Sequence, residues 1–227
     1  MENKFDIVVI GAGPGGYVAA IRASQLGFNT AVIEKAELGG VCLNWGCIPT
    51  KALLKSAQVY NYTKHLADYG VELRNADGSP VEADAVVSYA DIKKVVERER
   101  GVSAQMSKGI EFLFKKNKIT VLKGTAKILS GSQVEVTPEA EEAYTVEASH
   151  IIVATGSRPN SLPFAPIDGE KIISYRQALV PETLPKSMAI IGSGAIGSEF
   201  TYFYRSMGVD VTLIEFVDQI VPLEDKD

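Results

Sequence analysis

Two stretches of this chain, residues 4–35 and 186–216, share one order of apolar and polar positions at an offset of 181 residues. Each stretch begins with an apolar run of strand length, Ile7–Ile10 in the first and Met188–Ile191 in the second. A glycine-rich turn follows, and then about ten residues in which apolar side chains recur at helical spacing. A second β-rich run closes each stretch. The pattern predicts the order strand, turn, helix, strand twice in one chain.

Both turns read G-x-G-x-x-G, and both second strands end in a glutamate. The residues are Gly11, Gly13, Gly16 and Glu34 in the first copy and Gly192, Gly194, Gly197 and Glu215 in the second, with each glutamate 23 residues after the first glycine. The three glycines permit a tight turn, a close approach of backbone to a pyrophosphate, and close packing of helix on sheet. The helix N-terminus attracts phosphate, and the carboxylate accepts hydrogen bonds from a ribose 2′-OH. One such turn can be a plain tight turn, but two copies in this context predict two dinucleotide sites.

The only two cysteines, Cys42 and Cys47, lie in the short segment Gly39–Lys51. On a regular helix, residues five apart are separated by about 7.5 Å along the axis. A disulfide prefers Cα atoms about 4.4–6.8 Å apart, so the segment must leave helical geometry if the two cysteines are to bond. Gly46 and Pro49 make that departure feasible. The alternative is a pair of buried free thiols.

The rest of the chain predicts two helices, several short strands and a linker. We expect helices from Pro49 to about Ala67 and from Asp91 to about Asn117, with a mixed segment at residues 68–88 that contains the turn signal Asp77–Pro80. The expected strands are Ile119–Leu122, Lys127–Leu129, Gln133–Val136, Tyr144–Glu147 and Ile151–Ala154. They predict a small antiparallel meander that returns the chain to the first sheet. The stretch from Thr155 to Pro166 is interpreted as turn and linker, which puts a domain boundary near residue 160.

Composition excludes several classes of function. The chain has 227 residues, 46% of them hydrophobic and 22% charged, which is typical of a globular protein. Its net charge of −5 has the wrong sign for a nucleic-acid binder, and no apolar run approaches the roughly 20 residues of a membrane span. The cysteines lack metal-ligand spacing to the two histidines, His65 and His150. We therefore expect a cytoplasmic α/β protein with no metal, nucleic acid or membrane partner.

Four motifs together resemble the pyridine nucleotide–disulphide oxidoreductases. They are GAGPGG at 11–16, GGVCLNWGCIPTK at 39–51, ATGSRPN at 154–160 and GSGAIGSEF at 192–200. The resemblance covers all 227 residues and is nearest to members that oxidise dihydrolipoyl groups with NAD⁺. It implies two Rossmann-like units with the small antiparallel meander, as an FAD-binding domain at residues 1–160 and the first part of an NAD-binding domain at 161–227.

The resemblance also implies roles for individual residues. Cys42 would be the interchange thiol that meets a dithiol substrate, and Cys47 the charge-transfer thiol against the flavin, the two forming a disulfide in the oxidised protein. Lys51 would lie near the flavin ring in an ion pair with Glu199. FAD would be held by Gly11, Gly13, Pro14, Gly16, Glu34, Lys35, Gly40, Lys51, Thr155, Gly156 and Ser157, and NAD by Gly192, Gly194, Gly197 and Glu215. Electrons would pass from the dihydrolipoyl group to the cysteine pair, then to FAD and then to NAD⁺.

The partner implied is the dihydrolipoyl group of an acyltransferase or lipoyl carrier protein, and complete family members of this kind form homodimers. Such members continue through a dimerisation domain that supplies a His-Glu pair as acid and base. Neither His65 nor His150 matches that pair. We therefore expect the general base to come from sequence beyond Asp227, and the isolated chain to bind FAD weakly and to turn over little lipoamide.

Two rival functions stay open. Reductases of glutathione-like disulfides or of mercuric ion resemble this chain, but they generally use NADP, whose 2′-phosphate favours a nearby Arg or Lys. Here Glu215 is followed by Phe216, Val217 and Asp218, with no Arg or Lys among them, and the two carboxylates would repel that phosphate. The second rival is a non-catalytic nucleotide-binding or docking module.

Overall fold

The structure is a computed structural model that describes residues 3–81, 89–222 and 224–225. By its internal contacts the chain divides into two compact units. The first unit contains Met1–Pro49 and Arg100–Pro166, and the second contains Thr50–Glu99 and Ile167–Asp227. The sequence predicted an FAD-binding domain at residues 1–160 and an NAD-binding domain at residues 161–227. These domains are defined by the cofactor that each would bind, and they stay a prediction.

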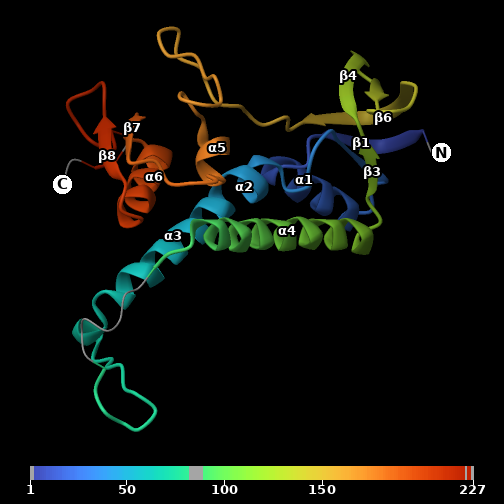
Figure 1. The fold of residues 1–227 in the computed structure, drawn as a ribbon. Helices are drawn as coiled ribbons and strands as arrows, with labels where there is room; N and C mark the ends of the chain where they lie inside the picture. Colours follow the sequence, from blue (N-terminus) through green and yellow to red (C-terminus); the bar gives the residue numbers. More distant parts are fainter. Residues whose placement is uncertain (1–2, 82–88, 223, 226–227) are drawn as a thin grey trace. The chain divides into compact units, whose positions relative to one another are not determined.

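One six-stranded mixed sheet forms the core of the first unit (Figure 1). Its strands are β1 (Lys4–Ile10), β2 (Thr30–Glu34), β3 (Thr120–Lys123), β4 (Thr125–Ser130), β5 (Gln133–Thr137) and β6 (Tyr144–Val153). Their order across the sheet is β3-β2-β1-β6-β5-β4. β1 runs parallel to β2 and β6, and β2 runs parallel to β3, whereas β5 is antiparallel to both of its neighbours. The fold class is the expected α/β architecture, and β1 lies at its centre.

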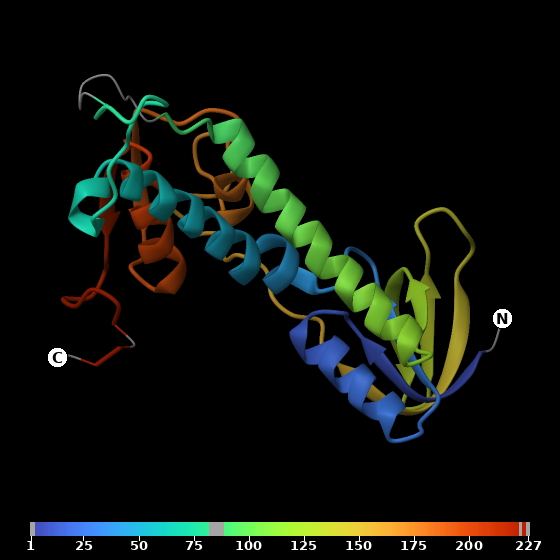
Figure 2. The ribbon, with the colours of Figure 1, turned by 90° about the horizontal axis from the view of Figure 1, so that it is seen from below.

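Alternate residues of β1 point to opposite faces of the sheet, and both faces are covered by apolar side chains. Val9 packs with side chains of α1 (Pro14–Gln25) and α4 (Ile92–Lys116), which lie along one face (Figure 2). Val8 and Ile10 point to the opposite face and pack with side chains of β5 and β6. Successive strand residues point to opposite faces, so both faces of this apolar run are buried. This burial fixes the carboxyl end of β1, where the first glycine-rich turn begins.

The second unit carries the second copy of the strand–turn–helix–strand pattern. β7 (Ser187–Ile191) pairs in parallel with β8 (Asp210–Ile214), and α6 (Ala195–Ser206) connects them. The parallel register joins Met188 to Val211 and Ile191 to Ile214. The unit also contains most of α3 (Cys47–Thr63), η1 (Leu66–Tyr69), α5 (Tyr175–Leu179) and the first part of α4. The carboxyl ends of β7 and β8 therefore lie together beside the start of α6.

A short helix, α5, is in contact with α6 in the second unit. Ser174 and Gln177 form a capping box. The Ser174 hydroxyl accepts a hydrogen bond from the backbone of the first helical turn, and the Gln177 side chain accepts one from the backbone N–H of Ser174. The hydroxyl of Tyr204 on α6 donates a hydrogen bond to the carbonyl oxygen of Ala178 at 2.8 Å. Burial raises the pKa of Tyr204, so this hydroxyl keeps its proton. The contact ties α6 to the segment that leads into β7.

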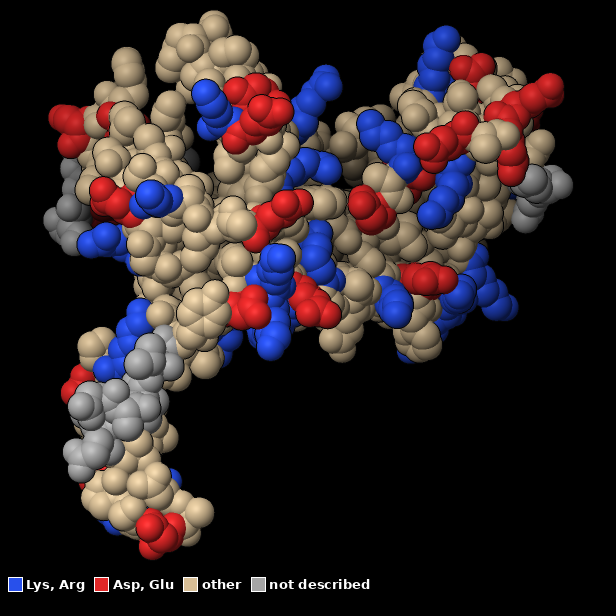
Figure 3. Space-filling model, in the orientation of Figure 1, with Lys and Arg blue, Asp and Glu red and all other residues tan. Residues whose placement is uncertain are grey.

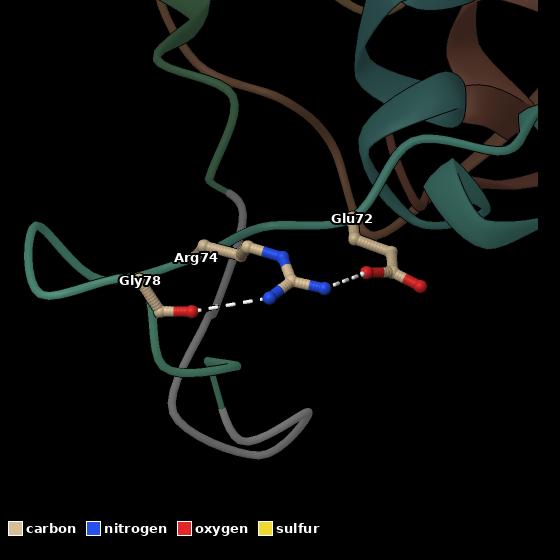
Figure 4. A network of polar contacts seen from close by, with 3 residues as sticks. All are labelled: Glu72, Arg74 and Gly78. Carbon is tan, nitrogen blue, oxygen red and sulfur yellow. Dashed lines mark hydrogen bonds and ion pairs between the residues drawn. The ribbon is translucent and has the colours of Figure 1, made fainter.

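The structure confirms the turn expected at Asp77–Pro80 (Figure 4). The hydroxyl and the backbone N–H of Ser79 donate to Asp77 Oδ1 at 2.6 and 2.9 Å. These bonds hold the pKa of Asp77 below its usual value. Arg74 braces the turn by donating to the Glu72 carboxylate at 2.9 Å and to the Gly78 carbonyl at 3.1 Å. Residues 82–88 of the mixed segment lie outside the described residues.

Three expectations about elements are corrected, and one further element, α5, was not predicted. The strands expected at Tyr144–Glu147 and Ile151–Ala154 are one continuous strand, because the first half of β6 pairs with β5 and the second half with β1. The strand expected at Ile119–Leu122 is a parallel neighbour of β2 and does not belong to the meander. The helix expected to reach Ala67 ends at Thr63. α5 was not expected, since five residues are too few to show helical periodicity.

No helix among the described residues is long and apolar enough to cross a membrane. On the face that Figure 3 shows, Lys and Arg side chains lie among Asp and Glu side chains.

Candidate nucleotide and dithiol site

The first glycine-rich turn joins β1 to α1 and requires glycine at two positions. Gly11 has a φ of +102°, and a Cβ on it would lie 2.2 Å from the carbonyl oxygen of Ala154. A Cβ on Gly16 would lie 1.8 Å from the carbonyl oxygen of Gly11. Any side chain at either position would therefore push backbone atoms apart. The turn holds the start of α1 against the carboxyl ends of β1 and β6.

The N-terminus of α1 offers a place for an anionic group. Its N-cap is Gly13, which makes no side-chain capping bond, and Pro14 is the first residue of the helix. The backbone N–H groups of the first turn and the positive end of the helix dipole attract phosphate. Thr155 lies beside this turn, with its Cα 3.3 Å from the place of a Cβ on Gly11.

Glu34, at the end of β2, is oriented by the backbone of the same turn. Its Oε2 accepts a hydrogen bond from the N–H of Ala12 at 2.7 Å, and its Oε1 accepts one from the N–H of Ala36 at 2.8 Å. In a dinucleotide site of this kind, the carboxylate at this strand end is the group that binds a ribose hydroxyl. The first unit therefore brings the three glycines, Glu34 and Thr155 to one end of its parallel strands.

The second turn repeats this geometry in the second unit. Gly192 has a φ of +99°, and a Cβ on Gly197 would lie 1.8 Å from the carbonyl oxygen of Gly192. Gly194 is the N-cap of α6 and makes no side-chain capping bond. The second unit thus offers a second anion-attracting helix N-terminus of the same construction.

Glu215 is held more firmly than its counterpart Glu34. Its Oε2 accepts hydrogen bonds from the backbone N–H of Ser193 at 2.8 Å and from the Ser193 hydroxyl at 2.7 Å. Its Oε1 accepts bonds from the N–H groups of Phe216 and Val217 at 2.7 and 3.2 Å. The backbone and side chain of Ser193, followed by the two further N–H groups, lower the pKa of Glu215 to about 2. The carboxylate is therefore negatively charged at any physiological pH.

Both turns fit a dinucleotide by the chemistry of their groups. Each combines a helix N-terminus without a side-chain cap, glycines that leave no side chain over it, and a carboxylate at the next strand end. These are the groups that receive a pyrophosphate and a ribose hydroxyl. Among the described residues, no cluster of three or more His, Cys, Asp or Glu could hold a metal ion.

The two cysteines lie on either side of a break between two helices. α2 (Gly40–Trp45) ends at Gly46, whose φ of −146° and ψ of −113° are not helical, and α3 begins at Cys47. A Cβ on Gly46 would lie 3.4 Å from the Cα of Cys42, so the backbone folds closely at this point. The expected departure from helical geometry between the cysteines is confirmed. Cys42 is half-buried and Cys47 is exposed. The disulfide of the oxidised protein stays a prediction.

The cysteine segment rests directly on the first glycine-rich turn. Gly40 has a φ of +59°, and a Cβ on it would lie 2.6 Å from the Cα of Gly13. The N–H of Gly39 donates to the carbonyl oxygen of Ala12 at 2.9 Å. Glycine at position 40 is thus what lets the thiol-bearing helix approach the proposed phosphate-binding turn.

A polar network, which sequence reasoning missed, joins α4 to α2. Arg100 donates to the carbonyl oxygen of Asn44 at 2.7 Å, and its guanidinium lies 4.5 Å from the centre of the Trp45 ring. The Ser107 hydroxyl lies 2.7 Å from the carbonyl oxygen of Leu38 and 2.8 Å from Asn44 Oδ1. These residues are far apart in the sequence. The available signal in the sequence was the spacing of Arg100 and Ser107, which puts two polar side chains on one face of α4.

Lys51 and Glu199 form the expected ion pair, from α3 and α6 of the second unit. The Lys51 side chain is 61% exposed and that of Glu199 is 26% exposed. The pair is therefore confirmed, although Lys51 is not buried. Its place beside a flavin stays a prediction.

The remaining predicted cofactor residues lie at exposed positions near strand ends. Lys35 is exposed in the bend that follows β2. Gly156, with a φ of +71°, and Ser157 are exposed in the segment that follows β6. Their roles toward a cofactor stay predictions.

Comparison with known proteins agrees with this geometry. The family model described as pyridine nucleotide–disulphide oxidoreductase matches residues 5–227. A dihydrolipoyl dehydrogenase of Rhizobium etli is 49% identical over 239 residues, covering 99% of this chain and 47% of the relative. A leghemoglobin reductase of Vigna unguiculata is 46% identical over 226 residues, covering 99% of this chain and 41% of the relative. The chain spans about half the length of the curated relatives it matches.

A solved structure agrees as well. The crystal structure of LpdA from Mycobacterium tuberculosis matches with a TM-score of 0.84 and 26% sequence identity. The match covers 99% of this chain and 47% of that one.

Proposed function

The chain belongs to the pyridine nucleotide–disulphide oxidoreductase family, and we propose that it oxidises dihydrolipoyl groups with NAD⁺ by way of Cys42 and Cys47. One observation carries the proposal. The segment that bears both cysteines is anchored on the first glycine-rich turn, through the close approach of Gly40 to Gly13. A dithiol and a dinucleotide-binding turn in direct contact suit an enzyme that exchanges electrons between thiols and a nucleotide cofactor.

The first unit has the groups that would hold FAD. The N-terminus of α1 would receive the pyrophosphate, Glu34 a ribose hydroxyl, and the Thr155 segment would line the same edge. Bound there, FAD supplies a two-electron acceptor between thiols and nicotinamide. The corresponding groups of the second unit, at Gly194 and Glu215, would hold NAD.

The chemistry of the chain's own residues is thiol–disulfide exchange. In the oxidised protein, a thiolate of the substrate attacks the sulfur of Cys42 and releases the sulfur of Cys47 as a thiolate. The second thiolate of the substrate then attacks the mixed disulfide and releases Cys42. The substrate thus loses two electrons and two protons and leaves as the cyclic disulfide, and the cysteine pair gains them.

NAD is the proposed nicotinamide partner because of Glu215. A 2′-phosphate would approach a carboxylate that four hydrogen bonds hold in its ionised form. The proposal also includes the lipoyl group of an acyltransferase or carrier protein as the substrate's source, a homodimer, a cytoplasmic location, and the domains at 1–160 and 161–227.

Two half-reactions test the proposal on protein loaded with FAD. Dihydrolipoamide should bleach the visible flavin absorption of the wild-type protein under anaerobic conditions. Cys42→Ser should abolish this bleaching, because the substrate then has no sulfur to attack, while bleaching by NADH should persist. Bleaching of the variant by dihydrolipoamide at the wild-type rate would contradict the proposed role of Cys42.

A further inference from the structure

The helix that carries Cys42 is short and ends between the two cysteines. α2 has six residues, too few to be stable on its own, so contacts with the rest of the protein must hold it. The last carbonyl groups of any helix lack partners within the helix. For Asn44, that partner is the guanidinium of Arg100 on α4, which donates to its carbonyl oxygen at 2.7 Å.

The same guanidinium also holds the residue before the break. Its centre lies 4.5 Å from the middle of the Trp45 ring, which is a cation–π contact. Arg100 is half-buried, so solvent screens this contact only in part. One charged group therefore fixes two consecutive residues, and Gly46 and Cys47 follow directly.

A second contact holds the other end of the segment. Asn44 Nδ2 donates to the carbonyl oxygens of Leu38 and Gly40, each at 3.0 Å. The Ser107 hydroxyl lies within hydrogen-bond distance of Asn44 Oδ1 and of the Leu38 carbonyl oxygen, and donates its one proton to either of them. α4 thus braces α2 at both ends, on either side of Cys42.

From these contacts we infer that Arg100 is a positioning residue, which favours the disulfide form of the Cys42–Cys47 pair by holding the helix break at Gly46. A disulfide closes more readily when its two cysteines are already held in place, because less conformational freedom is lost on closure. Without Arg100, α2 would loosen and the dithiol form would gain that freedom. The inference rests on the proposed redox function.

Equilibration with dithiothreitol measures this effect directly. In that reaction reduced dithiothreitol gives two electrons and two protons to the cysteine pair and becomes a cyclic disulfide. The free thiols are trapped with an alkylating reagent, and mass spectrometry gives the fractions of the dithiol and disulfide forms. Their ratio at each dithiothreitol ratio gives the equilibrium constant. Arg100→Met should shift it about tenfold toward the dithiol, which is about 30 mV for a two-electron couple. Ser107→Ala should shift it in the same direction by less.

Arg98→Met is the matched control on the same helix. Arg98 donates to the carbonyl oxygen of Ala52 at 2.9 Å and to the Ser56 hydroxyl at 3.2 Å, both of which follow Cys47 on α3. Its loss removes the same kind of bond without touching the segment between the cysteines. The equilibrium constant should therefore equal that of the wild-type protein.

Melting temperatures in both redox states separate positioning from general stability. A merely structural role would lower both melting temperatures equally and leave the equilibrium constant unchanged, which would overturn the inference. If Arg100→Met fails to fold, the Ser107→Ala shift decides instead. If the wild-type protein forms no disulfide at any dithiothreitol ratio, the proposed redox function itself fails, which is a different outcome.

Discussion

The same hydrogen bond recurs at one residue in each copy of the repeat. Glu34 accepts from the N–H of Ala12 at 2.7 Å, and Glu215 accepts from the N–H of Ser193 at 2.8 Å. Each N–H belongs to the residue after the first glycine of its turn. The bond aims the carboxylate across the turn, and a carboxylate held in this way loses less entropy when it binds a ligand. Ser193 adds a hydroxyl donor that Ala12 cannot provide.

The charge of Glu215 should decide the choice of nicotinamide cofactor. Glu215→Gln keeps the size of the side chain but removes the repulsion of a 2′-phosphate. We expect the ratio of the dissociation constants of NADPH and NADH to fall about tenfold, which is about 1.4 kcal/mol. Fluorescence titration with both nucleotides measures the ratio. Asp210→Asn, at the opposite end of β8, is the control and should leave it unchanged.

The same carboxylate should titrate far below the usual range. Its pKa is lowered from 4.5 to about 2, so its contribution to folding is fully present above about pH 4.5 and is lost as the pH falls toward 2. The carboxyl carbon resonance of Glu215, followed by NMR against pH, should have its midpoint near 2. A midpoint near 4.5 would show that the bonds from Ser193 and the following N–H groups do not hold in solution.

At the scale of an element, the glycine-rich turns depend on the absence of a Cβ. Gly16→Ala should destabilise the first unit by about 1–3 kcal/mol and weaken FAD binding, because the new carbon would lie 1.8 Å from the Gly11 carbonyl oxygen. Chemical denaturation and flavin titration measure the two effects. Gly109→Ala in α4 meets no atom within 4 Å, so it should stabilise the protein by about 0.5–1 kcal/mol. Equal effects of the two substitutions would contradict the steric argument.

The elements that the sequence predicted well are those with a local pattern. Both glycine-rich turns, the helices around them and the helix break at Gly46 follow from spacing within about 30 residues. β6 was predicted as two strands, whereas it is one strand whose pairing partner changes from β5 in its first half to β1 in its second half. That change is set by which strand lies alongside, and no local pattern encodes it.

Two further features, one of the fold and one of the site, illustrate the same limit. α5 has no periodicity to read, yet the S-x-x-Q spacing of Ser174 and Gln177 is a capping-box signal that could have found it. The bond from Arg100 to Asn44 spans 56 positions and depends on how α4 packs. Tertiary packing alone creates such a contact.

For the whole molecule, each of the two units carries one glycine-rich turn, and we propose one nucleotide site at each turn. Gly16→Ala should therefore impair FAD binding and leave NADH binding within about twofold of wild type. Gly197→Ala, whose Cβ would meet the Gly192 carbonyl oxygen at the same 1.8 Å, should do the reverse. Titration of each variant with each nucleotide is the measurement. If each variant lost the binding of both FAD and NADH, the two nucleotides would share a single site.

The central claim is that Cys42 and Cys47 are a reversible redox pair, and counting thiols tests it most directly. The protein is oxidised with diamide and freed of reagent, and its reactive thiols are counted under denaturing conditions before and after treatment with dihydrolipoamide. Since the chain has only these two cysteines, we expect none before reduction and two after it. Two reactive thiols in the fully oxidised protein would contradict the account.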